Sequence, residues 1–405
     1  MSELKLKVKN MSQNTSSKSV LINPLIARDV SEPHRAATPL ELFYDLIYVL
    51  AIASLAAELH HAISAAHHVI HAIGMYFFIL FLVWWPWNSY TWFASGFDTD
   101  DAQFRLASFA QMIGVVFIAV GIKAAFLEND FLVMMIGYVI MRVPYILMWL
   151  KVAHDDENYR SVAFRYAIGV AGVQIIWTIS ILYFSSWAIF IGLIVLEMLV
   201  PYLAESTKDK GKNTHYHFAH IEERMGLLTI IVLGESILAV VYTFEKAVSN
   251  LTADIMSLAV GAVLILFSMW WLYFDDFVEE HLGNQKKAFI WAYGHYFVFA
   301  FATAVGVLIS VNADVMTGSA RVSEFHAVLA LSVAIVGYLI SVWLCHDFLM
   351  EKKGPARYEL IVLAVVVLAI AYFTQSILLI GVAFTFLNIL RLRSRHKQFS
   401  LLKEK

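Results

Sequence analysis

Long apolar runs alternate with short polar segments along almost the whole chain, and most of the runs are about 20 residues long. An α-helix rises about 1.5 Å per residue, so a run of this length crosses the roughly 30 Å hydrocarbon core of a bilayer. The pattern therefore predicts twelve membrane-spanning helices, near residues 40–59, 72–93, 104–127, 131–153, 163–184, 187–204, 220–243, 253–275, 286–311, 325–349, 358–374 and 376–392.

The last two predicted helices come from one apolar run, residues 359–390, which is interrupted only at Thr374, Gln375 and Ser376. One long tilted helix is the alternative. We favour a tight hairpin, because the earlier run 163–204 is broken in a similar way by two serines.

The composition supports the same class of protein. Hydrophobic residues make up 60% of the 405 residues and charged residues only 15%, with a mean hydropathy of +0.69. A soluble domain carries roughly a quarter charged residues. In lipid only helices and closed barrels satisfy their backbone hydrogen bonds, and the alternation typical of a barrel is absent from this sequence. We therefore predict an all-α integral protein of the cell membrane that crosses the lipid bilayer many times.

The distribution of basic residues predicts the orientation. With the N-terminus in the cytoplasm, all but four of the 29 Lys and Arg fall on cytoplasmic segments. The exceptions are Lys123, Arg142, Lys246 and Arg321. This asymmetry follows the positive-inside rule and supports an even number of spans, with both termini cytoplasmic.

The two halves of the chain resemble each other. Residues 41–55 align with residues 223–237, and the Trp pair at 84–85 aligns with the pair at 270–271. These matches keep their order and a nearly constant offset, which predicts a duplication of six plus six helices. Both halves begin and end in the cytoplasm, so the repeats are expected to be parallel, as in some secondary transporters.

The duplication divides the chain into five parts. Residues 39–204 form the first six-helix repeat, 205–219 a cytoplasmic linker and 220–392 the second repeat. Residues 1–38 are polar and basic and lack the apolar core of a signal peptide, so we expect a disordered cytoplasmic tail there. Residues 393–405 form a basic cytoplasmic tail.

One carboxylate lies deep inside a predicted span. In the stretch 215–241 a His-rich, charged approach leads into an apolar helix that contains Glu235, roughly 18 Å along the helix from Glu223. An acid near the middle of a bilayer costs several kcal/mol unless it is paired, protonated or wet, and by default marks a functional site. The alternative is a protonated Glu235 that makes a structural hydrogen bond to a neighbouring helix.

A buried cation is predicted as well. Arg142 lies near the middle of the fourth span, where a guanidinium is costly and cannot lose its proton. Glu235 and Glu197 are expected at similar depths and can supply the partner, and His295 can join them. The simpler interpretation is a static ion pair that fixes helix packing.

Two acids mark the start of the first span. Glu41 and Asp45 are spaced i, i+4 and therefore share one face of the helix. Acids here favour the positive end of the helix dipole, so they can simply stabilise the helix start. The other interpretation is an inner gate, in which they pair with basic groups such as Arg224.

Two further acids, Asp155 and Asp347, lie at the cytoplasmic ends of predicted helices. Each is followed ten residues later by an arginine, across a short loop. We predict that each Asp braces its own cytoplasmic hairpin, Asp155 to Arg165 and Asp347 to Arg357.

Histidines gather between residues 60 and 71, at the outer end of the first hairpin. His60, His67 and His71 share a helix face, and His67 with His71 has the spacing of many metal-binding pairs. Imidazole suits zinc, copper or nickel. We favour the plainer interpretation that histidine supplies polarity to this loop, because only Glu58 is close enough in sequence to complete a ligand set.

Two stretches resemble a known family. Residues 37–51, ATPLELFYDLIYVLA, resemble an opening-helix motif of the type ELFFDLVFVFAL, and residues 217–240, HFAHIEERMGLLTIIVLGESILAV, resemble a mid-chain motif of the type H…ER-GLLTIIxLGE. Both motifs belong to the bacterial low temperature requirement protein A family. The similarity covers residues 36 to 392, with Tyr44 in place of the usual second Phe. The charged residues on motif positions are Glu41, Asp45, Glu223, Arg224 and Glu235.

The resemblance implies a polytopic membrane protein and no particular chemistry. Together with the repeat and the midplane charges, it predicts a secondary transporter, with or without proton coupling, or a channel-like protein, of unknown solute. The alternative is a membrane sensor or assembly factor for cold or stress adaptation that transports nothing. No P-loop, HExxH or Ser/His/Asp arrangement occurs, so we expect neither an ATP-driven pump nor an enzyme. We expect no cofactor and no nucleic-acid partner, and the oligomeric state stays open.

Overall fold

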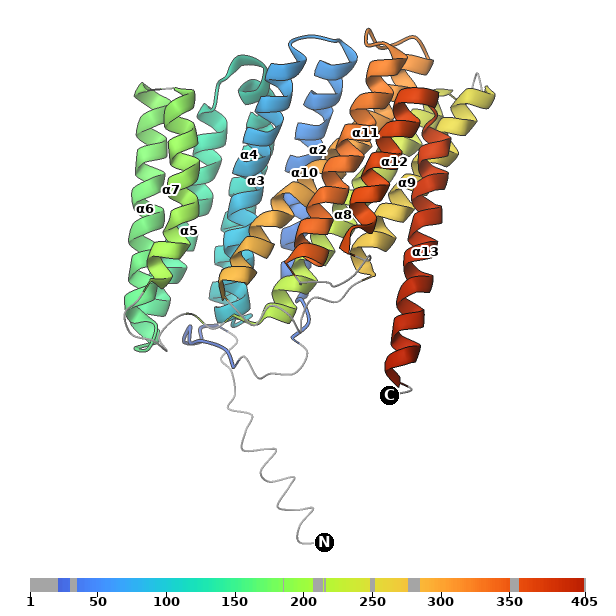
Figure 1. Cartoon of the computed structure of the whole chain (residues 1–405). Helices are drawn as coiled ribbons and strands as arrows, with labels where there is room; N and C mark the ends of the chain where they lie inside the picture. The colour runs from blue at the N-terminus through green and yellow to red at the C-terminus, as the bar shows by residue number, and fades with distance from the viewer. Residues whose placement is uncertain are drawn as a thin grey trace. The chain divides into compact units, whose positions relative to one another are not determined.

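The computed structural model describes residues 21–29, 35–184, 186–206, 214, 216–247, 252–275, 285–349 and 357–403. Regular structure in these residues is helical throughout (Figure 1). The twelve α-helices are α2 (Pro39–Ser64), α3 (Val69–Phe97), α4 (Ala102–Glu128), α5 (Leu132–Asp155), α6 (Arg160–Tyr183), α7 (Trp187–Glu205), α8 (Phe218–Ala247), α9 (Ala253–Phe274), α10 (Gln285–Met316), α11 (Glu324–Val342), α12 (Glu359–Thr374) and α13 (Ile377–Lys403). A short π-helix, η3 (Trp343–Phe348), continues α11. The all-α prediction is confirmed.

Nine of the helices in the described part of the chain are long and apolar enough to cross a membrane. They are α2 to α7, α9, α10 from Lys287 onward, and α11 together with η3. The α12 helix is apolar but shorter than these nine. The protein is therefore a multi-pass membrane protein, as the hydropathy pattern predicts.

The helices form two compact units. Unit 1 consists of Met1–Glu32, Trp92–Gly114 and Met135–Tyr216, and unit 2 of Pro33–Thr91, Val115–Met134 and His217–Lys405. The first helix, α2, thus belongs to the same unit as α8 to α13. The six-plus-six duplication stays a prediction.

In unit 2 the α10 helix packs against α2, α8 and α11. The α9 helix packs against α8 and α13, and α12 packs against α11 and α13. Glycine permits a close crossing of α9 and α13, since a Cβ at Gly261 would lie 2.7 Å from the backbone of Ile377. Small residues at such crossings let helix backbones approach each other within a membrane.

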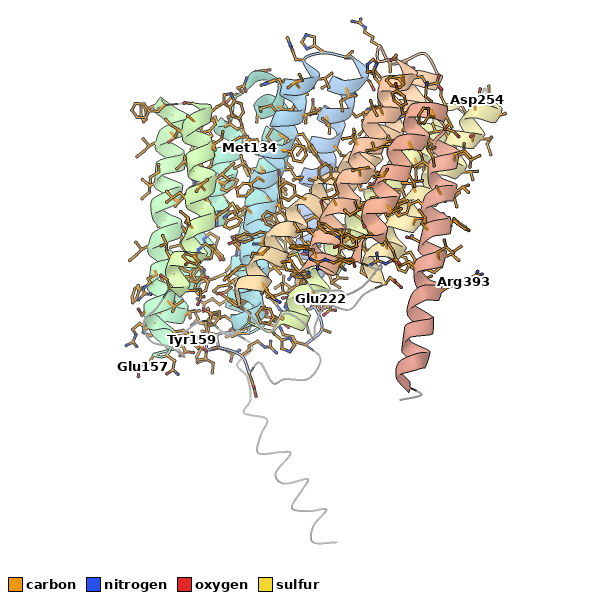
Figure 2. The ribbon with its side chains drawn as sticks, viewed as in Figure 1. Met134, Glu157, Tyr159, Glu222, Asp254 and Arg393 are labelled. Atoms are coloured by element: carbon orange, nitrogen blue, oxygen red, sulfur yellow. The ribbon has the colours of Figure 1, made fainter. Side chains whose placement is uncertain are left out.

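The two ends of unit 2 can be named after α2: the Pro39 end, where α2 begins, and the Ser64 end, where it finishes. The α13 helix finishes at the Pro39 end (Figure 1). Glu222, early in α8, lies at the Pro39 end, whereas Asp254, early in α9, lies at the Ser64 end (Figure 2). Because α2 and α8 start at the same end and pack together, their first turns come within reach of each other.

Local sequence explains where α2 begins. Thr38 Oγ1 accepts a hydrogen bond from the Glu41 amide (3.2 Å), and Glu41 Oε2 accepts one from the Thr38 amide (2.8 Å). This reciprocal capping box is completed by Pro39 at the first helical position, where a missing N–H costs nothing. Helix capping is therefore one role of Glu41.

The end of the chain contains two helices, as the hairpin prediction requires. The α12 helix finishes at Thr374, and Gln375 adopts a left-handed conformation with φ of 52°. This conformation is uncommon for a residue other than glycine and reverses the chain before α13 begins at Ile377.

Part of the N-terminal segment is ordered, although we predicted a disordered tail through residue 38. Alternate backbone amides donate to carboxylates of unit 1, from Asn23 to Asp101 (2.6 Å), from Leu25 to Asp155 (2.9 Å) and from Ala27 to Asp156 (3.0 Å). The donors are main-chain groups, so the side-chain pattern of residues 21–29 gives no sign of them. Residues 1–20 lie outside the described residues.

Candidate functional site

A partly open cavity of about 590 Å³ lies among α2, α8 and α10 of unit 2. Aliphatic side chains such as Ile52, Val232 and Val307 form part of its wall, and acidic and hydroxyl side chains form the rest. Its volume falls within the usual range of small-molecule sites, about 300–1,000 Å³.

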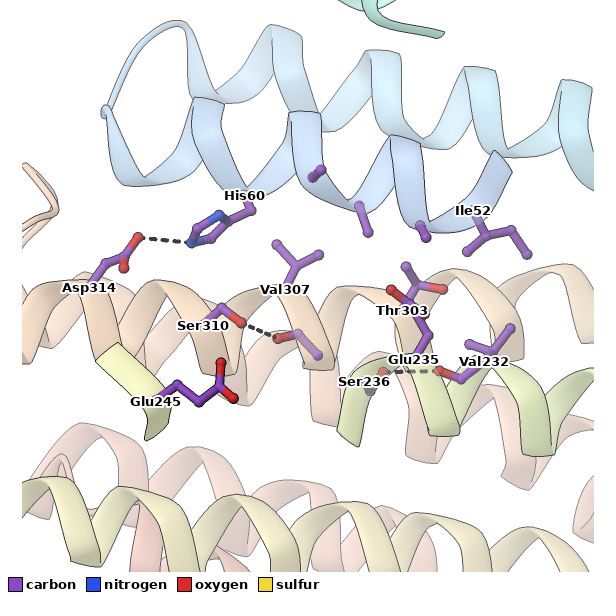
Figure 3. Close-up of a pocket in the computed structure, with 14 residues that line it drawn as sticks. Ile52, His60, Val232, Glu235, Ser236, Glu245, Thr303, Val307, Ser310 and Asp314 are labelled. Atoms are coloured by element: carbon purple, nitrogen blue, oxygen red, sulfur yellow. Dashed lines mark hydrogen bonds and ion pairs between the residues drawn. The ribbon is translucent and has the colours of Figure 1, made fainter. Parts of the chain in front are cut away.

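Glu235 extends from α8 into this cavity (Figure 3). The side chain is half-buried, and no basic side chain or hydrogen-bond donor among the described residues contacts its carboxylate. The structural hydrogen bond that we considered for Glu235 is therefore not formed within the described part of the chain.

The remaining acids of the cavity lie nearer the Ser64 end. Asp314 of α10 lies 2.9 Å from His60 Nε2 of α2, and Ser64 Oγ donates to the same Asp314 oxygen at 3.0 Å. Glu245, late in α8, is exposed. Figure 3 shows His60 and Asp314 at one end of the cavity and Glu235 nearer Ile52 and Val232.

Glycine sets the distance between α8 and α10 at the cavity wall. A Cβ at Gly306 would lie 2.5 Å from Ser236 Oγ, so any side chain there would force the two helices apart. Ser236 Oγ donates within its own helix to the Val232 carbonyl (3.2 Å). Ser236 Oγ also lies 3.4 Å from the Ala302 carbonyl of α10, so the residue next to Glu235 contacts that helix directly.

A second group of polar side chains lies at the Pro39 end of unit 2. Its members are Arg35, Glu41, Asp45, His220 and Arg224, which we call the Arg224 cluster, and all five are buried. Arg224 contacts both acids, with Nε 3.1 Å from Asp45 Oδ2 and Nη1 3.2 Å from Glu41 Oε1. Arg35 Nη2 also lies 3.2 Å from Glu41 Oε1.

Geometry fixes the protonation of His220. Arg35 Nη1 lies 3.2 Å from His220 Nδ1, and a guanidinium can only donate, so Nδ1 accepts. The proton is then on Nε2, which lies 3.1 Å from Glu41 Oε1. With a neutral imidazole, the two guanidinium groups balance the two carboxylates and the cluster carries no net charge.

Aromatic side chains lie near the ion pair of Asp45 and Arg224. Trp87 Nε1 donates to Asp45 Oδ1 at 2.6 Å, and the Trp87 ring lies 6.0 Å from the Arg224 guanidinium. The buried Tyr44 ring stacks on Tyr90, with centroids 3.9 Å apart. These rings exclude water and so strengthen the ion pair by lowering the local dielectric constant.

One of the two interpretations of Glu41 and Asp45 paired them with Arg224, and these three side chains are in contact. Glu223 is exposed and lies beside them, where its Oε2 accepts from the Ala37 amide (3.1 Å). Arg35, His220 and Trp87 were missed. His220 had a usable signal, since it lies one helical turn before Arg224 and therefore on the same face.

Arg142 has a partner in unit 1. Its Nη2 lies 3.1 Å from Glu197 Oε2, and both side chains are buried. The rings of Tyr138 and Tyr145 flank the guanidinium, at 5.7 and 5.9 Å from their centroids. Of the two acids that we considered as partners, the structure supplies Glu197.

His295 lies elsewhere on α10 than the cavity. It is buried, its Nε2 lies 2.9 Å from the Tyr273 hydroxyl and its Nδ1 lies 2.8 Å from the Trp291 carbonyl. Thr303, which lines the cavity, follows His295 by about 12 Å along the helix. The structure thus places His295 in a polar contact between α9 and α10.

The outer histidines make different contacts. His60 faces Asp314, as described above, whereas the rings of His67 and His68 contact each other, with centroids 4.2 Å apart. Within the described residues, no group of three or more His, Cys, Asp or Glu side chains is placed to hold a metal ion. We therefore assign no metal to His60, His67 and His71.

Both predicted hairpin braces were wrong. Asp155 pairs with Lys151 of its own helix, with Oδ2 and Nζ 2.7 Å apart. Asp347 pairs with Arg391 of α13, through two contacts of 2.8 and 3.1 Å. The Arg357 guanidinium instead lies 4.9 Å from the centroid of the Phe348 ring. An arginine across each loop was predicted as the partner, but the folded chain pairs each Asp with a different residue.

The sequence also gave no reason to single out Glu205, at the end of α7. Its Oε2 accepts from the Thr214 amide (2.9 Å), and its Oε1 accepts from the Tyr216 hydroxyl (2.9 Å) and the Tyr166 hydroxyl (3.2 Å). Burial raises the pKa of Tyr216 well above its usual range, so this hydroxyl keeps the proton that it donates. The end of the central loop is thereby tied to α7.

Two comparisons relate this chain to known proteins. A protein of Rhizobium meliloti (strain 1021), described as uncharacterized, is 25% identical over 273 residues, which cover 65% of this chain and 62% of that protein. This chain thus aligns with less than two thirds of that relative's length. The family model for the bacterial low temperature requirement A protein (LtrA) matches residues 36–391. The match includes both stretches that meet in the Arg224 cluster and all of the cavity, and the chain belongs to the LtrA family.

Proposed function

We propose that this LtrA-family membrane protein is a secondary transporter, that the cavity among α2, α8 and α10 holds its solute, and that Glu235 exchanges protons during transport. The observation that carries the proposal is a carboxylate inside a bundle of apolar helices that faces a cavity and has no partner among the described side chains. Ionisable groups inside a membrane are costly and are typical of solute pathways and proton relays.

The Arg224 cluster supports a gate at one end of this path. The cavity extends from Glu235 toward His60 and Asp314, near the Ser64 end. Arg224 precedes Glu235 on α8 by roughly 16 Å, and the cluster fills the space between α2 and α8 at the Pro39 end. We propose that this arrangement corresponds to a state in which the solute site communicates with the Ser64 end.

The positive-inside distribution supports a cytoplasmic position for the Pro39 end. The Arg224 cluster is then an inner gate, and it opens when Arg224 leaves Glu41 or Asp45. An ion pair in a dry environment suits this role, because its net stability is small while the cost of separating it without water is large. Entry of water from the cytoplasm would lower that cost.

A sensor or assembly factor remains the second candidate, because the buried pairs of Arg224 and Arg142 can also fix helices in place. The cavity distinguishes the two proposals. A protein that only holds helices together has no need of a partly open space of about 590 Å³ lined by Glu235.

The test is solute flux in proteoliposomes with an imposed pH gradient. Wild type, Glu235→Gln and empty liposomes are compared over inorganic cations, inorganic anions, amines, carboxylates and neutral metabolites. We expect at least one class to accumulate in a gradient-dependent manner with wild type alone. Equal uptake by all three preparations for every class would reject transport, and gradient-driven uptake that survives Glu235→Gln would reject the role of Glu235.

A further inference from the structure

We infer that the solute of the cavity is a small organic cation with N–H donors and an apolar body, such as a protonated primary amine. This inference rests on the proposed function, because it names the substrate class of the same site. Three features of the cavity lead to it: the sign of its charge, the apolar surface beside its carboxylates, and a buried hydroxyl that can accept a hydrogen bond.

The charge of the lining is negative. The lining contains three carboxylates, those of Glu235, Glu245 and Asp314. The basic side chain among the described lining residues is His60, which already faces Asp314. Two carboxylates, Glu235 and Glu245, are left for the solute. Clefts lined by one sign of charge concentrate ions of the opposite sign.

The shape of the site does not suit a bare metal ion. Metal ions need several ligands that converge at about 2–2.6 Å, and no group of three or more His, Cys, Asp or Glu side chains among the described residues is placed to hold one. The cavity is also far larger than an ion. A cation with a body of several carbon atoms would fill it.

The cavity also offers apolar surface for the carbon body of such a cation. Ile52, Val232 and Val307 present aliphatic surface beside Glu235 (Figure 3). Burial of methylene groups against such a wall is favourable. The cavity therefore favours an amphipathic cation over an equally charged hydrated ion.

A buried hydroxyl supports N–H donors on the solute. Thr303 Oγ1 lies on the cavity wall and is buried. The neighbouring Tyr76 hydroxyl donates its proton to the Ala300 carbonyl (2.6 Å), so it can accept from Thr303 but cannot donate to it, and the Thr303 oxygen accepts no hydrogen bond from a described residue. A buried acceptor without a donor is costly, so a ligand that supplies the donor gains affinity. A primary ammonium can donate to both Glu235 and Thr303, whereas a quaternary ammonium can donate to neither.

The described lining also lacks the aromatic rings that bind quaternary ammonium groups, since it contains no Phe, Tyr or Trp.

A solute cation and a proton would compete for the Glu235 carboxylate. Binding of the ammonium releases the proton to the water on the open side. The transport cycle would then be an exchange of organic cation for proton.

The test measures access and binding by cysteine labelling, so it does not depend on flux. Cys345, the single native cysteine, is fully buried, and the wild-type chain serves as a blank. Ala57→Cys places a thiol on the cavity wall, and Ser319→Cys places one on an exposed turn beyond α10 as the matched control. If Ala57→Cys folds poorly, Ala53→Cys offers a second position on the same wall.

Cationic and anionic methanethiosulfonates of similar size are applied to each variant. We expect the ratio of cationic to anionic labelling rates at Ala57→Cys to exceed that at Ser319→Cys by about tenfold. The added change Glu235→Gln should reduce this excess. Equal ratios at the two positions would overturn the inference.

Protection from labelling then defines the ligand. Butylammonium should slow labelling of Ala57→Cys, and butanol, butyrate and tetramethylammonium should slow it less. Protection by butanol or butyrate equal to that by butylammonium would overturn the cationic class, and equal protection by tetramethylammonium would overturn the need for N–H donors. Either result leaves proton-coupled transport of another solute intact. Protection by butylammonium without flux in proteoliposomes would instead support the substrate class and reject transport.

Discussion

Asp45 and Arg224 lie 179 residues apart in the sequence, yet their side chains form a buried ion pair in unit 2. Arg224 Nε and Nη2 address the two oxygens of Asp45, which is the bidentate geometry that a guanidinium and a carboxylate favour. This pair joins the second turns of α2 and α8, the helices that carry the two family motifs. It is the contact that would have to break if the Pro39 end opens.

Asp45→Asn is expected to destabilise the protein by about 3 kcal/mol, because it leaves the Arg224 charge buried with one partner fewer. The loss is at the lower end for broken buried pairs, since Glu41 still faces Arg224. Thermal unfolding in detergent, followed by size-exclusion fluorescence, measures the effect. Asp254→Asn, an exposed acid at the Ser64 end, is the matched control and should cost less than about 1 kcal/mol.

The double variant Asp45→Asn with Arg224→Gln separates charge from packing. It should be more stable than Asp45→Asn alone, because no unbalanced cation remains. A double variant that is as unstable as the sum of its parts would show that the pair acts through shape and not through charge balance.

The Arg142–Glu197 pair predicts an asymmetry. Glu197→Gln strands a guanidinium that cannot lose its proton, whereas Arg142→Gln strands a carboxyl group that can take one up. Expression yield and melting temperature should therefore fall further for Glu197→Gln than for Arg142→Gln. The combined variant should recover much of the loss, and equal damage from the two single changes would argue against a charged pair.

The helices themselves followed from the sequence, because each apolar run is a local property and the membrane sets its length. The need of Arg142 for an acid, and the shared face of Glu41 and Asp45, followed from the same local reasoning. The identity of the acid that pairs with Arg142 could not be predicted, because Glu197 and Glu235 had the same expected depth in the membrane. Depth along a helix gives no information about its rotation.

The cavity could not be predicted, because it depends on three helices that are distant in sequence. The packing of α2 and α8 on α10 is what places Glu235 in one cavity with His60, Thr303 and Asp314. Gly306 sets the spacing between α8 and α10. The brace predicted for Asp347 failed for a related reason. Arg391 reaches Asp347 from α13, and no spacing rule within a hairpin can find a partner on another helix.

Cleavage of the central loop tests whether α2 is held by contacts alone. A protease site inserted after Lys210 would separate the chain between α7 and α8. We expect the two fragments to purify together in mild detergent, because α2 packs against α8 and α10 and Asp45 binds Arg224 across the cut. The same cut in the Asp45→Asn variant should release more of the N-terminal fragment, and full separation of the wild-type fragments would contradict this account of unit 2.

Orientation can be measured with fusions to alkaline phosphatase, which is active only outside the cytoplasm. Fusions at the C-terminus should be inactive, and fusions placed after Ser319, at the Ser64 end, should be active. The reverse pattern would put the Arg224 cluster on the outside and would rule out its assignment as an inner gate.

Glu235 is the residue on which the transport proposal depends, and its function can be separated from folding. Glu235→Gln should insert and unfold like wild type, because no described cation depends on its charge. The decisive measurement compares two modes of uptake by this variant in proteoliposomes. We predict that exchange of labelled for unlabelled solute at equal pH is weakened but persists, because Glu245 and Thr303 still line the cavity, while accumulation driven by a pH gradient is lost. Accumulation at the wild-type level by folded Glu235→Gln protein would contradict the account.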